Sequence, residues 1–334
     1  MDGGVAMKFL IAGYGSIGRR HMRNLLALGE RDIVLLRSNR STLPVDEIAD
    51  FPVETDLQAA LDHRPDAVII SNPTALHLNV AIPAAEAGCA LLIEKPVSHS
   101  LERVDELQQA AQRSGARILV GFHYRFHPGL RKARQLIVEG ALGRVHAVRA
   151  HWGEYLPNWH PWENFRESYA ARPDLGGGVV LTLCHPLDYL RWMVGEIRAL
   201  WAFTSSSAEL NLPVEDCAEI GLRFETGASG SVHLDYLQRP GEHTLQIICD
   251  QGVLRWSNAD GVLQVHRPGL EVETFAPPEG FERNWLFLDE MRHFLAVARG
   301  EVQPGCTLED GIRAQVIAQA VLDSGRDGQL KRLD

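Results

Sequence analysis

The sequence predicts an α/β protein of two domains: an N-terminal Rossmann domain with a doubly wound parallel sheet, and a C-terminal α/β domain with a large open, mostly antiparallel sheet. Two observations lead to this fold class. The chain has 334 residues, more than one ordinary hydrophobic core accommodates. Its first part alternates apolar runs with helical periodicity, whereas later strands follow one another with turn residues between them. We therefore place the first domain at 1–122 and the second at 123–334.

The first domain is predicted from apolar runs without polar alternation, the pattern of strands buried on both faces of a parallel sheet. The segments between them repeat apolar residues every three or four positions, as a helix does. Short connections favour helices on both faces of the sheet. The predicted strands are 8–12, 33–37, 67–71, 90–94 and 117–121, and the predicted helices are 16–28, 56–63, 74–87 and 101–114.

After residue 122 the pattern changes to a helix followed by a series of strands, which fits an antiparallel or mixed open sheet better than a second parallel one. Thr307 and Asp310 have the spacing of a capping box, so a closing helix should begin beside Thr307. The pattern leaves open whether the last two helices pack back on the first domain. The predicted helices are 128–139, 285–298 and 308–324, and the predicted strands are 145–152, 218–224, 230–236, 244–249, 253–257 and 262–266.

The composition is that of a globular protein, with 45% hydrophobic and 23% charged residues. No apolar run approaches the roughly 20 residues that a membrane helix needs, and the start MDGGVAMKFLIAG does not resemble a secretion signal. The formal net charge is −10 and basic blocks are absent, which argues against nucleic acid or an anionic membrane as partner. We expect a small-molecule partner.

The cysteines and histidines bear on location and on metals. Five scattered cysteines without a Cys-x-x-Cys pair are typical of a reduced, cytoplasmic protein. Fourteen histidines occur without a metal-ligand spacing such as His-Glu-x-x-His, and chance permits the four-residue separation of His123 and His127. We predict no metal site.

A glycine motif opens the first predicted helix. In LIAGYGSIGRRHMRNLL, Gly13, Gly15 and Gly18 form G-x-G-x-x-G directly between a strand and a helix. The first glycine permits a tight turn, the second lets the backbone approach a pyrophosphate, and the third allows close helix packing. A glycine-rich turn without a ligand is the alternative, but the strand–turn–helix context favours a dinucleotide.

The end of the second predicted strand indicates which dinucleotide binds. An acidic residue is expected there for a free ribose 2′-hydroxyl, yet VLLRSNRS has Arg37, then Ser38 and Arg40. Two guanidinium groups and a hydroxyl suit a 2′-phosphate. The cofactor is therefore predicted to be NADP in preference to NAD, unless these arginines are solvated loop charges.

Another motif follows the buried run in ALLIEKPVSHS. Glu94, Lys95 and Pro96 come in direct succession where the fourth long strand ends. On this stretch alone, the charges are better explained as a strand end that reaches solvent, with the proline ending the ladder.

Four segments in order carry a family resemblance: SNPTALH at 71–77, EKP at 94–96, HYRFHP at 123–128 and DLGGGVVLTLCHPLDYLRWMVGE at 174–196. With the first domain, they resemble the family of glucose-fructose oxidoreductase, inositol dehydrogenase and MocA-type proteins, over nearly the whole chain. The resemblance implies a Rossmann domain, an open-sheet α/β domain and a nicotinamide between them. Typical members oxidise or reduce a hydroxyl or keto carbon of a sugar, inositol or related polyol.

The resemblance also implies roles for single residues. Lys95 matches the lysine beside nicotinamide and substrate, and His185 matches the acid/base histidine. Both are the candidate catalytic residues. The candidate cofactor-binding residues are Gly13, Tyr14, Gly15, Ser16, Ile17, Gly18, Arg37, Ser38, Arg40, Asn72, Pro73, Thr74, His77, Glu94, Lys95, Pro96, Tyr124 and Arg125.

The segment before His185 departs from the family pattern. Many relatives place an aspartate three or four residues earlier, where this chain has Thr182 and Leu181. A threonine can hydrogen-bond but supplies no negative charge, which leaves the proton relay open. On a helix, His185 shares a face with Asp188, Tyr189 and Trp192, so plain packing is the alternative reading of this histidine.

The aromatic segment 151–174 offers rings and guanidinium groups that could stack on and hydrogen-bond a polyol. It could also be a dimer contact or a structured insertion. The candidate substrate-binding residues are Lys95, Tyr155, Arg166, Tyr169, Thr182 and His185.

Three classes of function stay open. The leading one is an NADP- or NAD-dependent oxidoreductase acting on a carbohydrate or polyol. The second is a glycoside hydrolase or lyase that oxidises its substrate transiently with a tightly bound cofactor. The third is a non-catalytic cofactor-sensing protein. We expect a homodimer or homotetramer, because the second face of an open sheet needs cover and because the family pairs such sheets.

Overall fold

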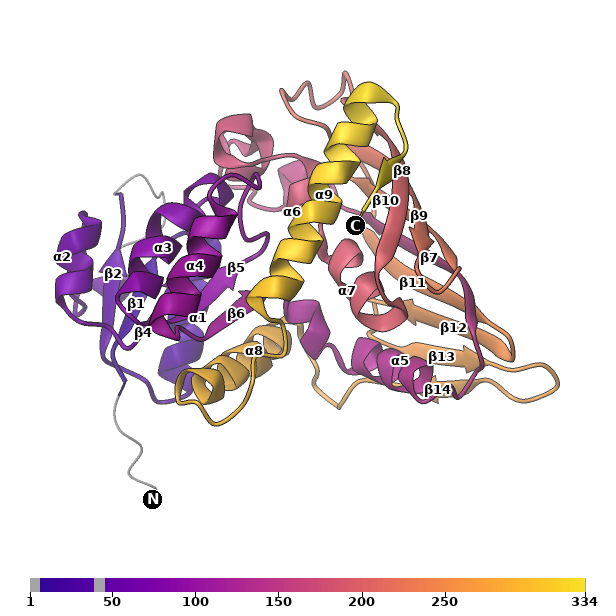
Figure 1. Cartoon of the computed structure of the whole chain (residues 1–334), viewed down its shortest axis with the longest axis horizontal. Coiled ribbons are helices and arrows are strands. Elements are labelled where there is room, and N and C mark those ends of the chain that lie inside the picture. The colour runs from indigo at the N-terminus through magenta and orange to yellow at the C-terminus, as the bar shows by residue number, and fades with distance from the viewer. Residues whose placement is uncertain (1–6, 39–45, 334) are drawn as a thin grey trace. The chain divides into compact units, whose positions relative to one another are not determined.

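The computed structural model describes residues 7–38 and 46–333. The chain divides into two units (Figure 1). The first comprises Met1–Phe122 and Arg283–Ile312, and the second comprises His123–Glu282 and Arg313–Asp334. The chain thus leaves the first unit after Phe122 and returns to it near the C-terminus.

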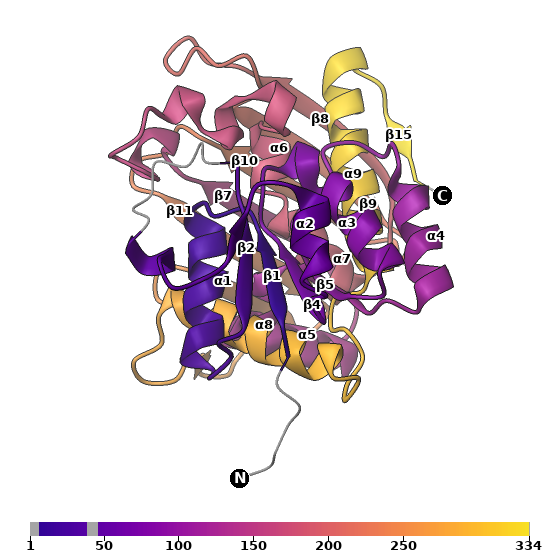
Figure 2. The ribbon, with the colours of Figure 1, turned by 90° about the vertical axis from the view of Figure 1, so that its left-hand side faces the viewer.

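The first unit is built on a six-stranded sheet with the strand order β3-β2-β1-β4-β5-β6, and all its strand pairs are parallel. This order is that of a doubly wound Rossmann sheet, which confirms the predicted fold. The four inner strands are wholly apolar and buried except at their ends, because helices cover both faces (Figure 2). The strands are β1 Phe9–Ala12, β2 Ile33–Leu36, β3 Val53–Glu54, β4 Ala67–Ile70, β5 Ala90–Glu94 and β6 Ile118–Gly121.

The α-helices that lie wholly within the described part of this unit are α1 Ser16–Ala27, α2 Leu57–Asp62, α3 His77–Glu86, α4 Val104–Ser114 and α8 Arg283–Ala298. Asp56 caps α2 by accepting a hydrogen bond from the Ala59 amide. The predicted helix 74–87 is split into a 3₁₀ turn, Thr74–Leu76, and α3. Helix α8 contacts α1, β5 and β6. Helix α8 thus packs on the six-stranded sheet.

The second unit is built on a nine-stranded sheet with the order β14-β13-β12-β11-β7-β10-β9-β8-β15. Within this sheet, the described residues form one parallel pair, β7–β10, and all other pairs are antiparallel, so the sheet is mostly antiparallel, as predicted. The strands are β7 Val145–Gly153, β8 Ile197–Ser205, β9 Cys217–Phe224, β10 Ser229–Asp235, β11 Glu242–Cys249, β12 Gly252–Ser257, β13 Leu263–His266, β14 Glu273–Phe275 and β15 Lys331–Arg332.

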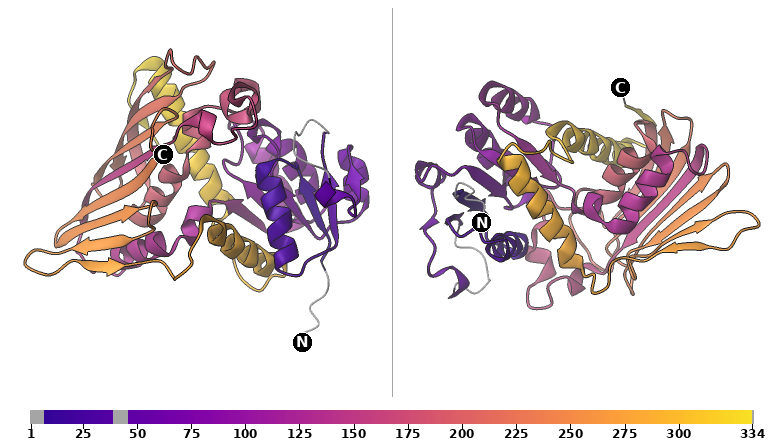
Figure 3. Two further views of the ribbon diagram at one scale, coloured as in Figure 1. Left: turned by 180° about the vertical axis from the view of Figure 1, so that it is seen from behind. Right: turned by 90° about the horizontal axis from the view of Figure 1, so that it is seen from below.

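Helices α5 Pro128–Val138, α6 Val179–Thr182 and α7 His185–Val194 pack against one face of this sheet (Figure 3). Helix α9, Leu308–Asp327, begins in the first unit and continues in the second. Its predicted capping box is present: the Asp310 amide donates to Thr307 Oγ1, and the Thr307 amide donates to Asp310 Oδ2, both at 3.1 Å. Among the described residues, no helix is long and apolar enough to cross a membrane.

Candidate functional site

The glycine turn between β1 and α1 meets the steric demands expected of it. Gly13 has φ +100°, and a Cβ there would lie 2.5 Å from the Asn72 amide nitrogen. A Cβ on Gly18 would lie 1.9 Å from the Gly13 carbonyl oxygen. These two glycines are therefore required by packing. At Gly15, by contrast, a Cβ would meet nothing within 4 Å.

Helix α1 begins immediately after this open position. No side chain caps its N-terminus, and its first turn carries no acidic residue. The free N–H groups and the positive end of the helix dipole are thus available to an anion beside Gly15. These features fit the pyrophosphate of a dinucleotide, and Gly13, Tyr14, Gly15, Ser16, Ile17 and Gly18 are the residues that would hold it.

The end of β2 carries the predicted 2′-phosphate residues. Arg37 is 8% exposed, with its guanidinium carbon 5.8 Å from the centre of the Tyr14 ring. Its Nε has no hydrogen-bond partner among the described residues. Ser38 is exposed, and Arg40 lies outside the described residues. The Arg37 Nε at the carboxyl end of β2 could therefore donate a hydrogen bond to a ligand.

Two loops at the carboxyl ends of β4 and β5 are tied together by His77. Its Nδ1 lies 3.0 Å from the Pro96 carbonyl oxygen and its Nε2 lies 3.0 Å from that of Asn72. Burial lowers the pKa of His77, while the two carbonyl oxygens that face its ring nitrogens act in the opposite direction. Asn72 in turn donates its side-chain amide to the Leu76 carbonyl at 3.2 Å. His77 thus positions the loops, and Pro73 and Thr74 lie within this tied segment.

Lys95 follows β5 and is half-buried. Its backbone amide donates to Glu94 Oε2 at 3.3 Å, and His21 Nε2 donates to Glu94 Oε1 at 2.7 Å. Burial alone would raise the pKa of Glu94, but the His21 hydrogen bond and the positive charge of Lys95 outweigh it and lower that pKa. The Glu94 carboxylate therefore fixes the backbone of Lys95 through this hydrogen bond.

His185 begins α7 in the second unit and is 1% exposed. Three rings surround it: His123 at 4.4 Å, Tyr124 at 4.9 Å and Trp152 at 5.6 Å between ring centroids. Sequence reasoning did not single out Trp152. The edge-on arrangement of the first two rings fixes the plane of the imidazole.

A buried ion pair connects the first turn of α7 to the 3₁₀ turn His123–Phe126. Arg125 donates from Nε to Asp188 Oδ2 at 2.9 Å and from a terminal nitrogen to Oδ1 at 2.7 Å. Both side chains are less than 5% exposed. Such a two-pronged pair fixes orientation, and breaking it would leave a buried charge. This contact supports the expectation that Asp188 orients its helix, and it gives Arg125 a role within the second unit.

A carboxyl that sequence reasoning missed lies beside α6, the helix that carries Thr182. The Val180 amide donates to Glu215 Oε1 at 3.2 Å, and a Cβ on Gly178 would lie 2.3 Å from that oxygen. Burial raises the pKa of Glu215 to about 7. A carboxyl group with a pKa near 7 thus contacts α6, the helix that has Leu181 and Thr182 where many relatives have an aspartate. Nothing in the motif announced it, because Glu215 comes from a loop more than thirty residues later.

Two of the predicted substrate residues of the aromatic segment, Tyr155 and Arg166, contact one later loop. Arg166 donates to the Leu210 carbonyl oxygen at 3.0 Å, and the Tyr155 hydroxyl lies 3.5 Å from Glu209. Tyr169 opens the 3₁₀ turn Tyr169–Ala171 and is 38% exposed. The structure therefore brings Tyr155 and Arg166 to neighbouring residues.

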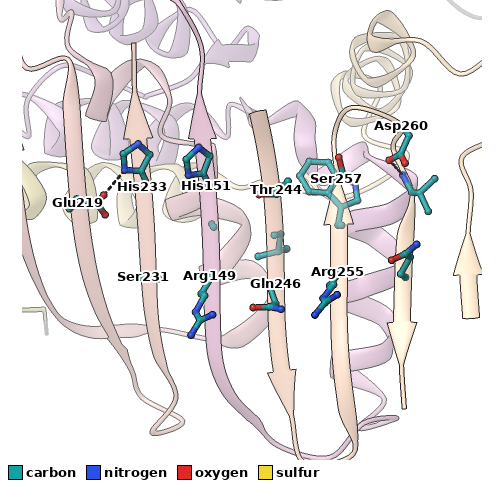
Figure 4. Close-up of a pocket in the computed structure, with 15 residues that line it drawn as sticks. Arg149, His151, Glu219, Ser231, His233, Thr244, Gln246, Arg255, Ser257 and Asp260 are labelled. Carbon is teal, nitrogen blue, oxygen red and sulfur yellow. Dashed lines mark hydrogen bonds and ion pairs between the residues drawn. The ribbon is translucent and has the colours of Figure 1, made fainter. Parts of the chain in front are cut away.

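The opposite face of the nine-stranded sheet carries a polar hollow of about 520 Å³. A row of side chains crosses it from strand to strand: Glu219, His233, His151, Thr244 and Ser257 (Figure 4). No predicted site residue lines it. The hollow is therefore a feature of the uncovered sheet face, separate from the candidate site.

The glycine turn and the free helix terminus define the class: a dinucleotide-binding α/β protein. Residues 7–122 match the family described as "Oxidoreductase family, NAD-binding Rossmann fold", and residues 130–255 match the "GFO/IDH/MocA C-terminal domain". The chain belongs to this Gfo/Idh/MocA family of oxidoreductases.

Individual relatives agree with the family assignment. The chain is 29% identical over 275 residues to 1,5-anhydro-D-fructose reductase of Ensifer adhaerens, covering 80% of each protein. It is 30% identical over 191 residues to 2,7-anhydro-N-acetylneuraminate hydratase of Mediterraneibacter gnavus, covering 56% of this chain and 49% of that protein. Levoglucosan dehydrogenase in complex with NADH has the same fold, with a TM-score of 0.87, 22% identity and coverage of 98% and 99%.

Proposed function

We propose that this protein transfers hydride between NADP and a hydroxyl or keto carbon of a sugar, inositol or related polyol. One observation carries the proposal. Arg37, Gly13, Asn72 and Lys95 follow the carboxyl ends of β2, β1, β4 and β5, which are consecutive in the sheet. This edge is where open α/β sheets bind ligands. A dinucleotide laid along it would have its 2′-phosphate near Arg37 and its nicotinamide near Lys95.

The proposed chemistry divides between cofactor and protein. The nicotinamide supplies the hydride acceptor or donor. In oxidation, Lys95 takes the hydroxyl proton or stabilises the developing alkoxide, and in reduction its ammonium polarises the carbonyl and returns the proton. His185 is the second acid/base group. Glu94 holds the Lys95 backbone, and the pair Arg125–Asp188 holds the helix that carries His185.

The proposed substrate class is supported by the relatives of this chain, which include an anhydro-fructose reductase and a myo-inositol dehydrogenase. Tyr155, Arg166, Tyr169 and Thr182 are the proposed contacts to its hydroxyl groups, since rings and guanidinium groups can stack on and hydrogen-bond a polyol. Incubation with NADP or NAD and a panel of sugars, inositols and anhydro sugars, followed by absorbance of the reduced nicotinamide, tests the activity. Reduction of the cofactor by at least one member is expected.

Cofactor preference is tested separately by titrating NADPH and NADH against the protein. We expect NADPH to bind more tightly, because Arg37, Ser38 and Arg40 offer a hydroxyl and two guanidinium groups to a 2′-phosphate and the sequence has no acidic residue directly after β2. Arg37→Asp should narrow or reverse the preference. Equal affinities of the parent protein for the two cofactors would contradict the assignment.

A second candidate function has an observation in its favour. One relative is named a hydratase, and addition of water involves no net oxidation. The same residues would then oxidise the substrate transiently and return the hydride. Turnover of an anhydro sugar without added cofactor, with product of unchanged oxidation level, would identify this function. Tight NADPH binding without turnover of any substrate would instead indicate a cofactor-sensing protein.

A further inference from the structure

A cluster of three titratable side chains is buried in the first unit, and the proposed mechanism uses only one of them. His21 comes from α1, Glu94 ends β5 and Glu290 comes from α8. Their exposed fractions are 0%, 7% and 0%. The imidazole nitrogen and carboxylate oxygens concerned all lie within 4.8 Å of one another. Helix α1, strand β5 and helix α8, which are far apart in the sequence, thus each contribute one side chain to this buried cluster.

The hydrogen bonds of the cluster are distributed unequally. Glu94 uses both oxygens, one with His21 at 2.7 Å and one with the Lys95 amide at 3.3 Å. Neither oxygen of Glu290 has a hydrogen-bond partner among the described residues. A fully buried carboxylate without partners would lose its hydration without compensation.

The surrounding charges also oppose ionisation of Glu290. Lys95, Arg20 and the rings of His21 and His77 lie around Glu94, and Arg20 is itself repelled by Arg283. Strand β6, which also contacts α8, carries no titratable side chain. The charged group that acts on Glu290 is the carboxylate of Glu94, which is of the same sign. A second negative charge at this distance inside the protein is strongly unfavourable.

We propose that Glu290 is a neutral carboxylic acid in the native protein, and that it forms with His21 and Glu94 a buried site that holds one proton behind Lys95. Glu290 is a positioning residue: it leaves Glu94 as the single carboxylate that binds the Lys95 backbone. Burial, and then the charge of Glu94, raise the pKa of Glu290 well above its ordinary value, which agrees with the geometry.

A bound divalent cation is the competing explanation, since one imidazole and two carboxylates are ordinary ligands. The distance of 2.7 Å between His21 Nε2 and Glu94 Oε1 is that of a hydrogen bond. Two ligands of a tetrahedral zinc ion, each about 2.0 to 2.2 Å from the metal, would lie about 3.3 to 3.6 Å apart. The geometry therefore favours a proton.

The proton is observed by infrared spectroscopy of the full-length protein in D₂O, without any substrate. At a pH of about 9, well above the pKa of about 7 of Glu215, the parent spectrum should contain a protonated-carboxyl band that is missing from Glu290→Gln. The band should be retained in Glu86→Gln, a control at an exposed glutamate of α3. Equal spectra for the parent protein and Glu290→Gln would overturn the proposal. Stoichiometric metal in the purified protein would also overturn it, in favour of a cation site.

Thermal unfolding against pH gives a second, independent measurement. The parent protein must hold a proton that its unfolded chain releases above a pH of about 4.5, so its stability should fall as pH rises from there. Glu290→Gln holds no such proton, so its Tm relative to the parent should rise between pH about 5 and about 8. A constant offset would indicate a packing role only and would overturn the proposal. Both measurements are independent of the oxidoreductase activity, so their failure is distinguishable from failure of the proposed function.

Discussion

Lys95 is the residue on which the proposed chemistry depends most. Lys95→Met keeps the aliphatic stem and removes the amine, so kcat should fall roughly 100-fold or more, the usual scale for a positioned acid or base. The dissociation constant of NADPH should change far less, because the glycine turn and Arg37 are proposed to carry that binding. Steady-state kinetics and a fluorescence titration measure the two quantities.

The matched control is Lys132→Met, at a half-buried lysine of α5 that hydrogen-bonds Gln135 and lies outside the candidate site. Its kcat should stay at the parental value. A near-parental kcat for Lys95→Met would reduce Lys95 to a solvated strand end, whose ion pair contributes about 0 to 1 kcal/mol.

Single residues differ in how well the sequence reveals them. The packing roles of Gly13 and Gly18 were predictable because they are set by a local turn whose parts are adjacent in the chain. Glu290 and Glu215 were not, because what makes each unusual is burial against partners from distant segments. The sequence does not show that a glutamate in a helix or loop will be buried, so it does not show that the pKa of its carboxyl will be raised.

At the scale of elements, two glycines at the start of α1 can be tested for different roles, Gly15 for ligand binding and Gly18 for packing. A Cβ at Gly15 meets nothing within 4 Å, whereas a Cβ at Gly18 would lie 1.9 Å from the Gly13 carbonyl oxygen. Gly15→Ala should therefore fold with a parental Tm yet bind NADPH at least about tenfold more weakly, since its methyl group fills the space where a pyrophosphate approaches.

Gly18→Ala serves as the contrast. It should lower the Tm as well, because α1 must move away from the turn. Thermal unfolding and NADPH titration of both variants are the measurements. Parental NADPH affinity in Gly15→Ala would show that the open space beside α1 is not the pyrophosphate site.

Helix α6 carries a pH-dependent feature through Glu215. Its pKa is about 7 in the folded protein against an ordinary value of 4.5, because the carboxyl is buried. The folded protein holds a proton that the unfolded chain releases between these values, so this stabilisation is complete below about 4.5 and is lost as pH rises through about 7. Glu215→Gln should therefore gain Tm relative to the parent across this window and then level off.

The control for this prediction is Glu139→Gln, at an exposed glutamate that ends α5. Its Tm should run parallel to that of the parent at every pH. A parallel curve for Glu215→Gln would show that Glu215 titrates as an ordinary surface carboxyl.

Most elements followed from periodicity, and β8 shows why some did not. Our prediction left out this strand of nine residues, as well as the short β3, β14 and β15. The pairing of β8 with β9 shifts register between Ile197 and Ala199, which is a bulge. Ala199 and Leu200 are then both buried, so the alternation that marks a half-buried strand is broken. The three short strands contain too few residues to form a pattern.

At the scale of the whole molecule, we predict a homodimer or homotetramer that uses the uncovered face of the nine-stranded sheet. Helices α5, α6 and α7 cover one face, and the other face carries the polar row Glu219, His233, His151, Thr244 and Ser257 over a broad hollow. A stable interface buries roughly 1,200 to 2,000 Å², an area that a broad sheet face can supply. Sedimentation velocity at micromolar concentration measures the state.

Ser231 tests this face directly, because it is exposed in the single chain and lines the hollow. Ser231→Arg adds a long charged side chain there, so it should shift sedimentation toward the monomer while leaving the Tm of the isolated chain nearly unchanged. Gln112→Arg, at an exposed position of α4 in the first unit, adds the same side chain elsewhere and should sediment as the parent does. A parent protein that is already monomeric would refute the oligomer, and an oligomer unaffected by Ser231→Arg would place the interface on a different surface.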